Sequence, residues 1–176
     1  MDLDDHGRTN PPVAGDELAT LRGFLDHHRQ TLRWKISGLS REQLLATHPP
    51  ASMTLLGMVK HLAYVESTWF VEVLQGGTVA PWDGVDWSLD PDWDWHSAAD
   101  DDPADVLELW QDAVARSDDA VLAAVDGLET RSARAHRWAE RPVSLRWILV
   151  HMIEEYARHN GHADLIRESI DGSVGE

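Results

Sequence analysis

Apolar residues recur at intervals of three and four along most of the chain, which is the spacing of helices with one buried face. The pattern predicts four long helices, which cover residues 15–38, 53–75, 103–126 and 144–172. After the first of them, Ser40 and Gln43 fit a capping box, so a short helical turn is expected to reach Ala46. The sequence has no stretch with the alternation typical of a strand.

The segments outside these helices differ in character. Residues 1–14 are polar and proline-containing, which favours a flexible N-terminal arm. Residues 77–102 form a connection too long for an ordinary helical hairpin, and they contain four Trp and eight Asp. A cover over a site is the usual role of such a loop. Residues 127–143 are predicted to form a loop with a short hairpin.

Length and composition support an ordinary globular fold. The chain has 176 residues, of which 43% are hydrophobic and 26% charged, so it can bury a core without disulfides. We therefore predict an all-α protein, a four-helix bundle that forms a single domain over residues 15–172. Its long Trp- and Asp-rich crossover is expected between the second and third helices.

The charge balance excludes several classes of partner. Fifteen Lys and Arg stand against 31 Asp and Glu, and the net charge of −16 argues against nucleic acid and anionic membranes as partners. The first residues lack the features of a signal peptide, and no apolar run approaches the ~20 residues of a membrane span, so we expect a cytoplasmic protein. Because the chain has no Cys, His and carboxylates are its only strong metal ligands.

One face of the fourth helix carries candidate metal ligands. His151, Glu155 and His159 lie four residues apart and share this face, because four residues advance only about 40° around an α-helix. A catalytic zinc site usually has three protein ligands, and His61 on the second helix can complete a set with Glu155 and His159. Two His and one carboxylate suit a divalent metal; zinc is our first expectation, and nickel, iron and manganese remain open. Packing or solvent contacts are the alternative interpretation of these residues.

The sequence lacks the motifs of other catalytic sites. The sequence has no His-Glu-x-x-His, no paired Glu-x-x-His and no Gly-x-Ser-x-Gly, which excludes the zinc-protease helix, a di-iron bundle and a nucleophile elbow. The run Asp90, Asp92 and Asp94 imitates a calcium loop, but Trp95 stands where such a loop needs Gly.

Two segments resemble a known family. LLGMVKHLAYVESTWF, from Leu55 to Phe70, resembles the second helix of the DinB-like superfamily, and SLRWILVHMIEEYARHNGH, from Ser144 to His162, resembles its last helix. The resemblance extends from about residue 18 to 170 and is closest to the branch that includes the N-terminal domain of mycothiol-dependent maleylpyruvate isomerases. It implies a metal-binding four-helix bundle and a metal-dependent thiol S-transferase.

The resemblance also implies roles for particular residues. His61 corresponds to the lone ligand from the second helix, and His159 corresponds to the last ligand from the fourth. Glu155 stands where many relatives have His and the isomerase-like branch has Glu. The isomerases carry an additional C-terminal domain, and this chain ends at Glu176 after the last helix, so isomerase activity is not expected.

We therefore expect a metal-dependent S-transferase that uses a small thiol such as mycothiol to attack an electrophile. We also expect the protein to form a homodimer. The alternative is a non-catalytic bundle that binds a small molecule or partner. Four further residues are candidates for contact with a metal ligand or with substrate, against the simpler interpretation of packing, surface hydrogen bonds or a salt bridge. They are His151, His162, Arg158 and Tyr64.

Overall fold

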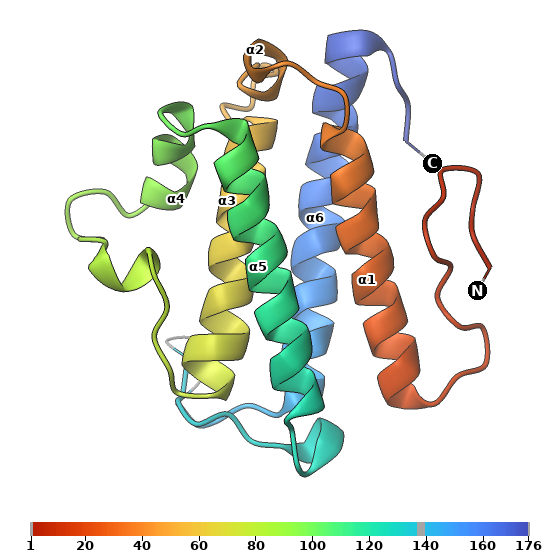
Figure 1. Ribbon diagram of the computed structural model, residues 1–176, viewed down its shortest axis with the longest axis vertical. Helices are drawn as coiled ribbons and strands as arrows, with labels where there is room; N and C mark the ends of the chain where they lie inside the picture. Colours follow the sequence, from red (N-terminus) through yellow and green to blue (C-terminus); the bar gives the residue numbers. More distant parts are fainter. Residues whose placement is uncertain (1, 137–139, 176) are drawn as a thin grey trace. The chain divides into compact units, whose positions relative to one another are not determined.

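The computed structural model describes residues 2–136 and 140–175 (Figure 1). Within these ranges the protein has six α-helices and no strands, which confirms the predicted all-α class, and the four long helices expected of a bundle are present. The helices are α1 (Glu17–Ile36), α2 (Arg41–Leu44), α3 (Leu55–Glu66), α4 (Trp93–His96), α5 (Pro103–Leu122) and α6 (Leu145–Asp171).

The chain divides into two compact units, and the first consists of Met1–Leu55 and Leu149–Glu176. Its two long helices, α1 and α6, run in the same direction (Figure 1). Asn160 on α6 donates a hydrogen bond to the carbonyl of His28 at 3.0 Å. About two helical turns further on, Arg167 donates to the carbonyl of Lys35 at 2.8 Å, which caps the end of α1. Side-chain to backbone hydrogen bonds therefore fix the register of this pair.

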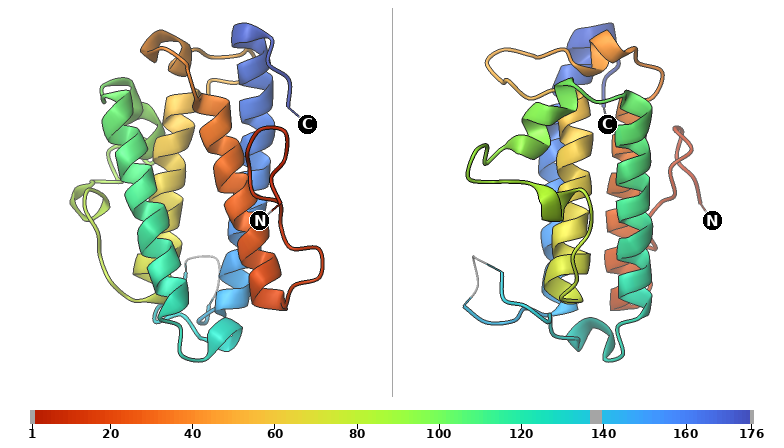
Figure 2. Two further views of the ribbon diagram at one scale, coloured as in Figure 1. Left: turned by 45° about the vertical axis from the view of Figure 1, so that its right-hand side comes forward. Right: turned by 60° about the vertical axis from the view of Figure 1, so that its left-hand side comes forward.

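The second unit, Leu56–Ile148, contains the other long helices. Here α3 continues without a break into a π-helical segment, η1 (Ser67–Leu74), which packs against α5. Both helices run in the same direction in Figure 1, so the chain has to return along their length between them. This explains why the crossover is long. It includes α4 and passes along α3, as Figure 2 shows.

Helix ends follow the local signals in the sequence. Ser40 and Gln43 form the predicted capping box at α2. The carboxylate of Asp102 accepts the N–H of Ala104 at 2.8 Å and begins α5, as predicted. The predicted end of this helix at residue 126 was wrong, because α5 ends at Leu122. Val125, beyond that end, is 92% exposed.

The predicted apolar stripes form the core. Large side chains from every long helix are fully buried, among them Leu32, Leu62, Trp110 and Ile148. Trp147 lies at the edge of this core, since it is 41% exposed and packs against buried Trp69.

The remaining segments carry little regular structure. Arg8 of the N-terminal arm donates a hydrogen bond to Thr31 on α1 at 2.9 Å. In the loop predicted over 127–143, the N–H of Ser132 donates to the carbonyl of Val143 at 2.8 Å, as a short hairpin requires. Residues 137–139 of this loop, and Met1 of the arm, lie outside the described residues. None of the described helices is both long and apolar enough to cross a membrane.

Candidate metal centre

Helical geometry brings Glu155 and His159 of α6 together. They lie one turn apart, and Oε2 of Glu155 is 3.5 Å from Nε2 of His159, whose residue is only 7% exposed. Two ligand atoms of a tetrahedral zinc ion, each about 2.0 Å from the metal, are about 3.3 Å apart. The two side chains therefore fit adjacent positions around one divalent ion.

His151 lies on the other side of the same carboxylate. Its Nε2 is 3.6 Å from Oε1 of Glu155, so the two oxygens of Glu155 are each approached by one imidazole. Burial lowers the pKa of His151, although Glu155 and Glu154 oppose this effect by favouring the charged ring. The neutral ring is the form that can bind a metal or hydrogen-bond to its ligand.

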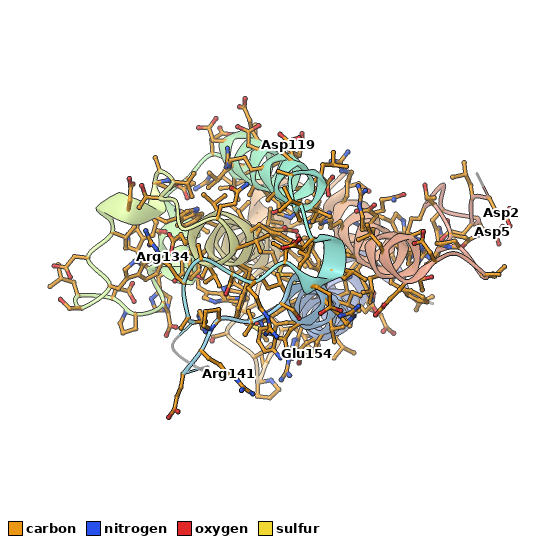
Figure 3. The ribbon with its side chains drawn as sticks, turned by 90° about the horizontal axis from the view of Figure 1, so that it is seen from below. Asp2, Asp5, Asp119, Arg134, Arg141 and Glu154 are labelled. Carbon is orange, nitrogen blue, oxygen red and sulfur yellow. The ribbon has the colours of Figure 1, made fainter. Side chains whose placement is uncertain are left out.

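A second set of potential ligands overlaps the first. His151, Glu154 and Glu155 each offer one ligand atom, and these atoms lie within 4.8 Å of one another. Glu154, however, is exposed on α6 (Figure 3) and accepts a hydrogen bond from Arg158. A solvated carboxylate already bound to a guanidinium is a weak third ligand. The better pair on α6 is therefore Glu155 with His159.

His162, one turn beyond His159, is half-buried. The two rings are tilted with their centroids 6.2 Å apart. Nδ1 of His162 has no hydrogen-bond partner in the described part of the chain. His162 therefore packs beside His159, with its Nδ1 buried.

His61 belongs to the second unit, where it is held by the crossover. Its Nδ1 lies 2.6 Å from Oδ2 of Asp94, a residue that is 3% exposed. Trp95 stacks on its ring with a centroid distance of 4.4 Å. A carboxylate in this position accepts a hydrogen bond from Nδ1–H, so that Nε2 is the nitrogen that can bind a metal, as in most His-ligated metal sites.

The neighbouring residue on α3 anchors the same loop. Lys60 is buried, and its ammonium group donates to Asp101 at 2.5 Å and to Ser97 at 2.7 Å. It also lies 4.2 Å from the ring centroid of Trp93. Two successive residues of α3 therefore bind the crossover, which keeps Asp94 close to His61.

Asp94 was missed as a functional residue by the sequence interpretation, which considered it only within the calcium-like run. The carboxylates of that run bind separate partners, since Asp90 accepts from His96 at 3.0 Å while Asp94 faces His61. No local signal in this Asp-rich loop marks Asp94, because its partner His61 lies 33 positions away in the sequence.

Tyr64, the last of the predicted site residues, lies one turn after His61 on α3. It packs against Trp82 and Trp87 of the crossover, with centroid distances of 5.3 and 4.6 Å. It also lines a small cavity together with residues of η1 and of the loop near Arg134. Tyr64 therefore joins the crossover to that cavity.

Glu155 and His159 lie together on one helix, and His61 on another helix is hydrogen-bonded to a carboxylate. These are features of metal-binding helical proteins. Comparison with protein families finds a match to the mycothiol S-transferase family over residues 20–172. The protein therefore belongs to this family, and the resemblance to the DinB-like superfamily is confirmed. A search of curated proteins finds no significant match.

Proposed function

We propose that this protein is a metal-dependent S-transferase in which Glu155 and His159 of the first unit, and His61 of the second, bind one divalent ion. The observation that carries the proposal is the Glu155–His159 pair, spaced for one ion in a member of the mycothiol S-transferase family. Zinc is the first candidate, and nickel, iron and manganese suit the same ligands. Three protein ligands leave a position open for substrate.

Each ligand is prepared for this role by its neighbours. The carboxylate of Asp94 accepts a hydrogen bond from Nδ1–H of His61 and so orients the ring, while stacking by Trp95 restricts the rotation of the ring. Helical geometry keeps Glu155 and His159 at ligand spacing without the ion. His151 approaches the second oxygen of Glu155 and limits its rotation. When bound, a divalent ion at these residues would lower the pKa of a nearby thiol.

The chain has no Cys, so the nucleophilic sulfur must come from a cosubstrate. Mycothiol is the thiol that the family match indicates. In the transfer, the thiol S–H bond breaks and its proton passes to water. The sulfur forms a bond to the electrophilic carbon, and the leaving group departs with the electrons of its own bond to that carbon. Action in the cytoplasm and as a homodimer are further parts of this proposal.

The test measures loss of thiol with a reporter electrophile, using protein stripped of metal by a chelator and then reloaded with zinc or nickel. Mycothiol, bacillithiol and glutathione are compared. We expect turnover only after reloading, with mycothiol preferred. Glu155→Gln should lose it, whereas Glu168→Gln, an exposed residue on the same helix, should not. No turnover with any thiol would contradict the proposal and favour the non-catalytic interpretation.

A further inference from the structure

A small polar cavity lies in the second unit, one turn along α3 from His61. Its volume is about 220 Å³, and Tyr64, Thr68 and Glu72 line one side. Arg134, labelled in Figure 3, and His136 line the other. Thr68 and Glu72 belong to η1, the π-helical continuation of α3.

The wall of this cavity is built by hydrogen bonds. The N–H of Arg134 donates to the carbonyl of Val73 at 3.1 Å, and the N–H of Ala133 donates to the carbonyl of Leu74 at 3.0 Å. The guanidinium of Arg134 donates to the carbonyl of Gly76 at 2.6 Å. These bonds attach the loop to the end of η1, so the cavity is formed before any ligand arrives.

Its polar groups include one without a partner. Oγ1 of Thr68 is buried and makes no hydrogen bond to any of the described residues. A helical Thr commonly bonds a carbonyl four residues earlier, and without that bond the hydroxyl of this cavity-lining residue has an unused donor and an unused acceptor. A ligand hydroxyl is the kind of group that would satisfy both.

The cavity is lined by one acidic and one basic residue, Glu72 and Arg134. Burial raises the pKa of Glu72, and the nearby guanidinium of Arg134 opposes this shift. An anionic ligand would meet the carboxylate of Glu72, and a cationic ligand would meet Arg134. A neutral ligand that both donates and accepts hydrogen bonds meets neither repulsion.

Aromatic rings complete the surroundings. His136 packs on Trp69 with a centroid distance of 4.4 Å, and Tyr64 is fixed by the crossover. The volume is below the ~300 Å³ at which pockets for drug-sized ligands begin, so it suits one six-membered ring. Hydroxyl, carboxylate, guanidinium and imidazole groups around an apolar rim are the chemistry that recognises a sugar or a cyclitol.

We propose that this cavity binds a neutral polyhydroxylated ring, and that this ring is the sugar or cyclitol end of the thiol cosubstrate. The identification of the ring with the thiol rests on the proposed function. Tyr64 lies three residues, or about 4.5 Å along the helix axis, from His61. A thiol whose sulfur is near His61 can therefore place a ring beyond its acyl linker against Thr68 and Glu72. Mycothiol is such a thiol, because its cysteine is attached to a glucosaminyl-inositol unit.

The first experiment measures binding of N-acetylglucosaminyl-inositol, which contains no sulfur and is uncharged, to the protein by ligand-observed NMR. Thr68→Val and Glu72→Gln keep the shape of each side chain and should weaken binding about 5- to 10-fold, the value of one hydrogen bond. Glu108→Gln, an exposed residue of α5, should leave binding unchanged. Thr68→Val should also leave the melting temperature of the free protein unchanged or raise it, because the lost hydroxyl makes no hydrogen bond.

The second experiment compares the KM for mycothiol with the KM for N-acetylcysteine, which has no ring. Both cavity variants should raise the first about 5- to 10-fold and leave the second unchanged. Wild-type protein that does not bind the sulfur-free ring, or variants that bind it as well as wild type, would overturn the inference. A protein that binds the ring through Thr68 and Glu72 but has no thiol turnover would support ring binding in the cavity. The same result would refute the S-transferase proposal.

Discussion

Replacing Asp94 tests whether the crossover prepares His61 for a metal. In Asp94→Asn the amide oxygen can still accept a hydrogen bond from Nδ1–H of His61. The substitution removes the negative charge of a buried residue, which is only 3% exposed. Trp95 still stacks on the ring and keeps part of its orientation. Loss of a residue that supports a ligating His typically costs about 10- to 100-fold in metal affinity, or about 1.4 to 2.7 kcal/mol. We expect Asp94→Asn to lower the zinc affinity about tenfold. Asp94→Ala, which removes both the charge and the hydrogen-bond acceptor, should lower it about 100-fold.

The assay is a zinc titration in competition with a chelating indicator. Asp92→Asn is the matched control, because Asp92 precedes α4 in the same loop and its side chain makes no capping hydrogen bond. It should bind zinc as wild type does. Wild-type affinity in Asp94→Asn, or an equal loss in Asp92→Asn, would refute a specific role for the Asp94–His61 hydrogen bond.

Two further predictions follow from pKa shifts. Burial lowers the pKa of His28 below its usual 6.5, so below this pH the unfolded chain binds a proton that the native state resists, and stability should fall as pH drops from 7 to 5. Urea unfolding of His28→Gln should show a flatter dependence over this range, and equal slopes would contradict the prediction. Burial raises the pKa of Glu72 above its usual 4.5, so ionisation of this carboxyl group destabilises the native state as the pH rises above 4.5. Glu72→Gln should therefore melt higher than wild type at pH 8 and lose this advantage as pH falls toward 4.5; a constant difference would count against it.

Local signals explain why most helix ends could be predicted. The capping box of Ser40 and Gln43 and the N-cap at Asp102 each depend on hydrogen bonds within four residues, so sequence alone specifies them. The change from α3 to η1 could not be predicted this way. A π turn alters which carbonyl each N–H bonds, yet Trp69 and Phe70 remain buried and the apolar pattern continues through it.

The candidate site divides along similar lines. The Glu155–His159 spacing is a property of one helix and is visible in the sequence. The contact between His61 and Asp94 joins residues 33 positions apart, and nothing in the local pattern of an Asp-rich loop marks one carboxylate as buried. The cavity at Thr68 was missed for the same reason, because Arg134 and His136 come from a loop distant in sequence.

Equilibrium dialysis against zinc at neutral pH, followed by elemental analysis, tests the proposed metal centre most directly. Wild-type protein should retain close to one equivalent of metal. His61→Ala, Glu155→Ala and His159→Ala should each fall below about a tenth of an equivalent, because a three-ligand site loses a coordinating atom in each. His162→Ala should retain most of the metal, since a residue next to a ligand contributes about 10- to 100-fold in affinity at most. A wild-type protein that holds no metal, or three variants that keep it, would contradict a metal centre built from these residues.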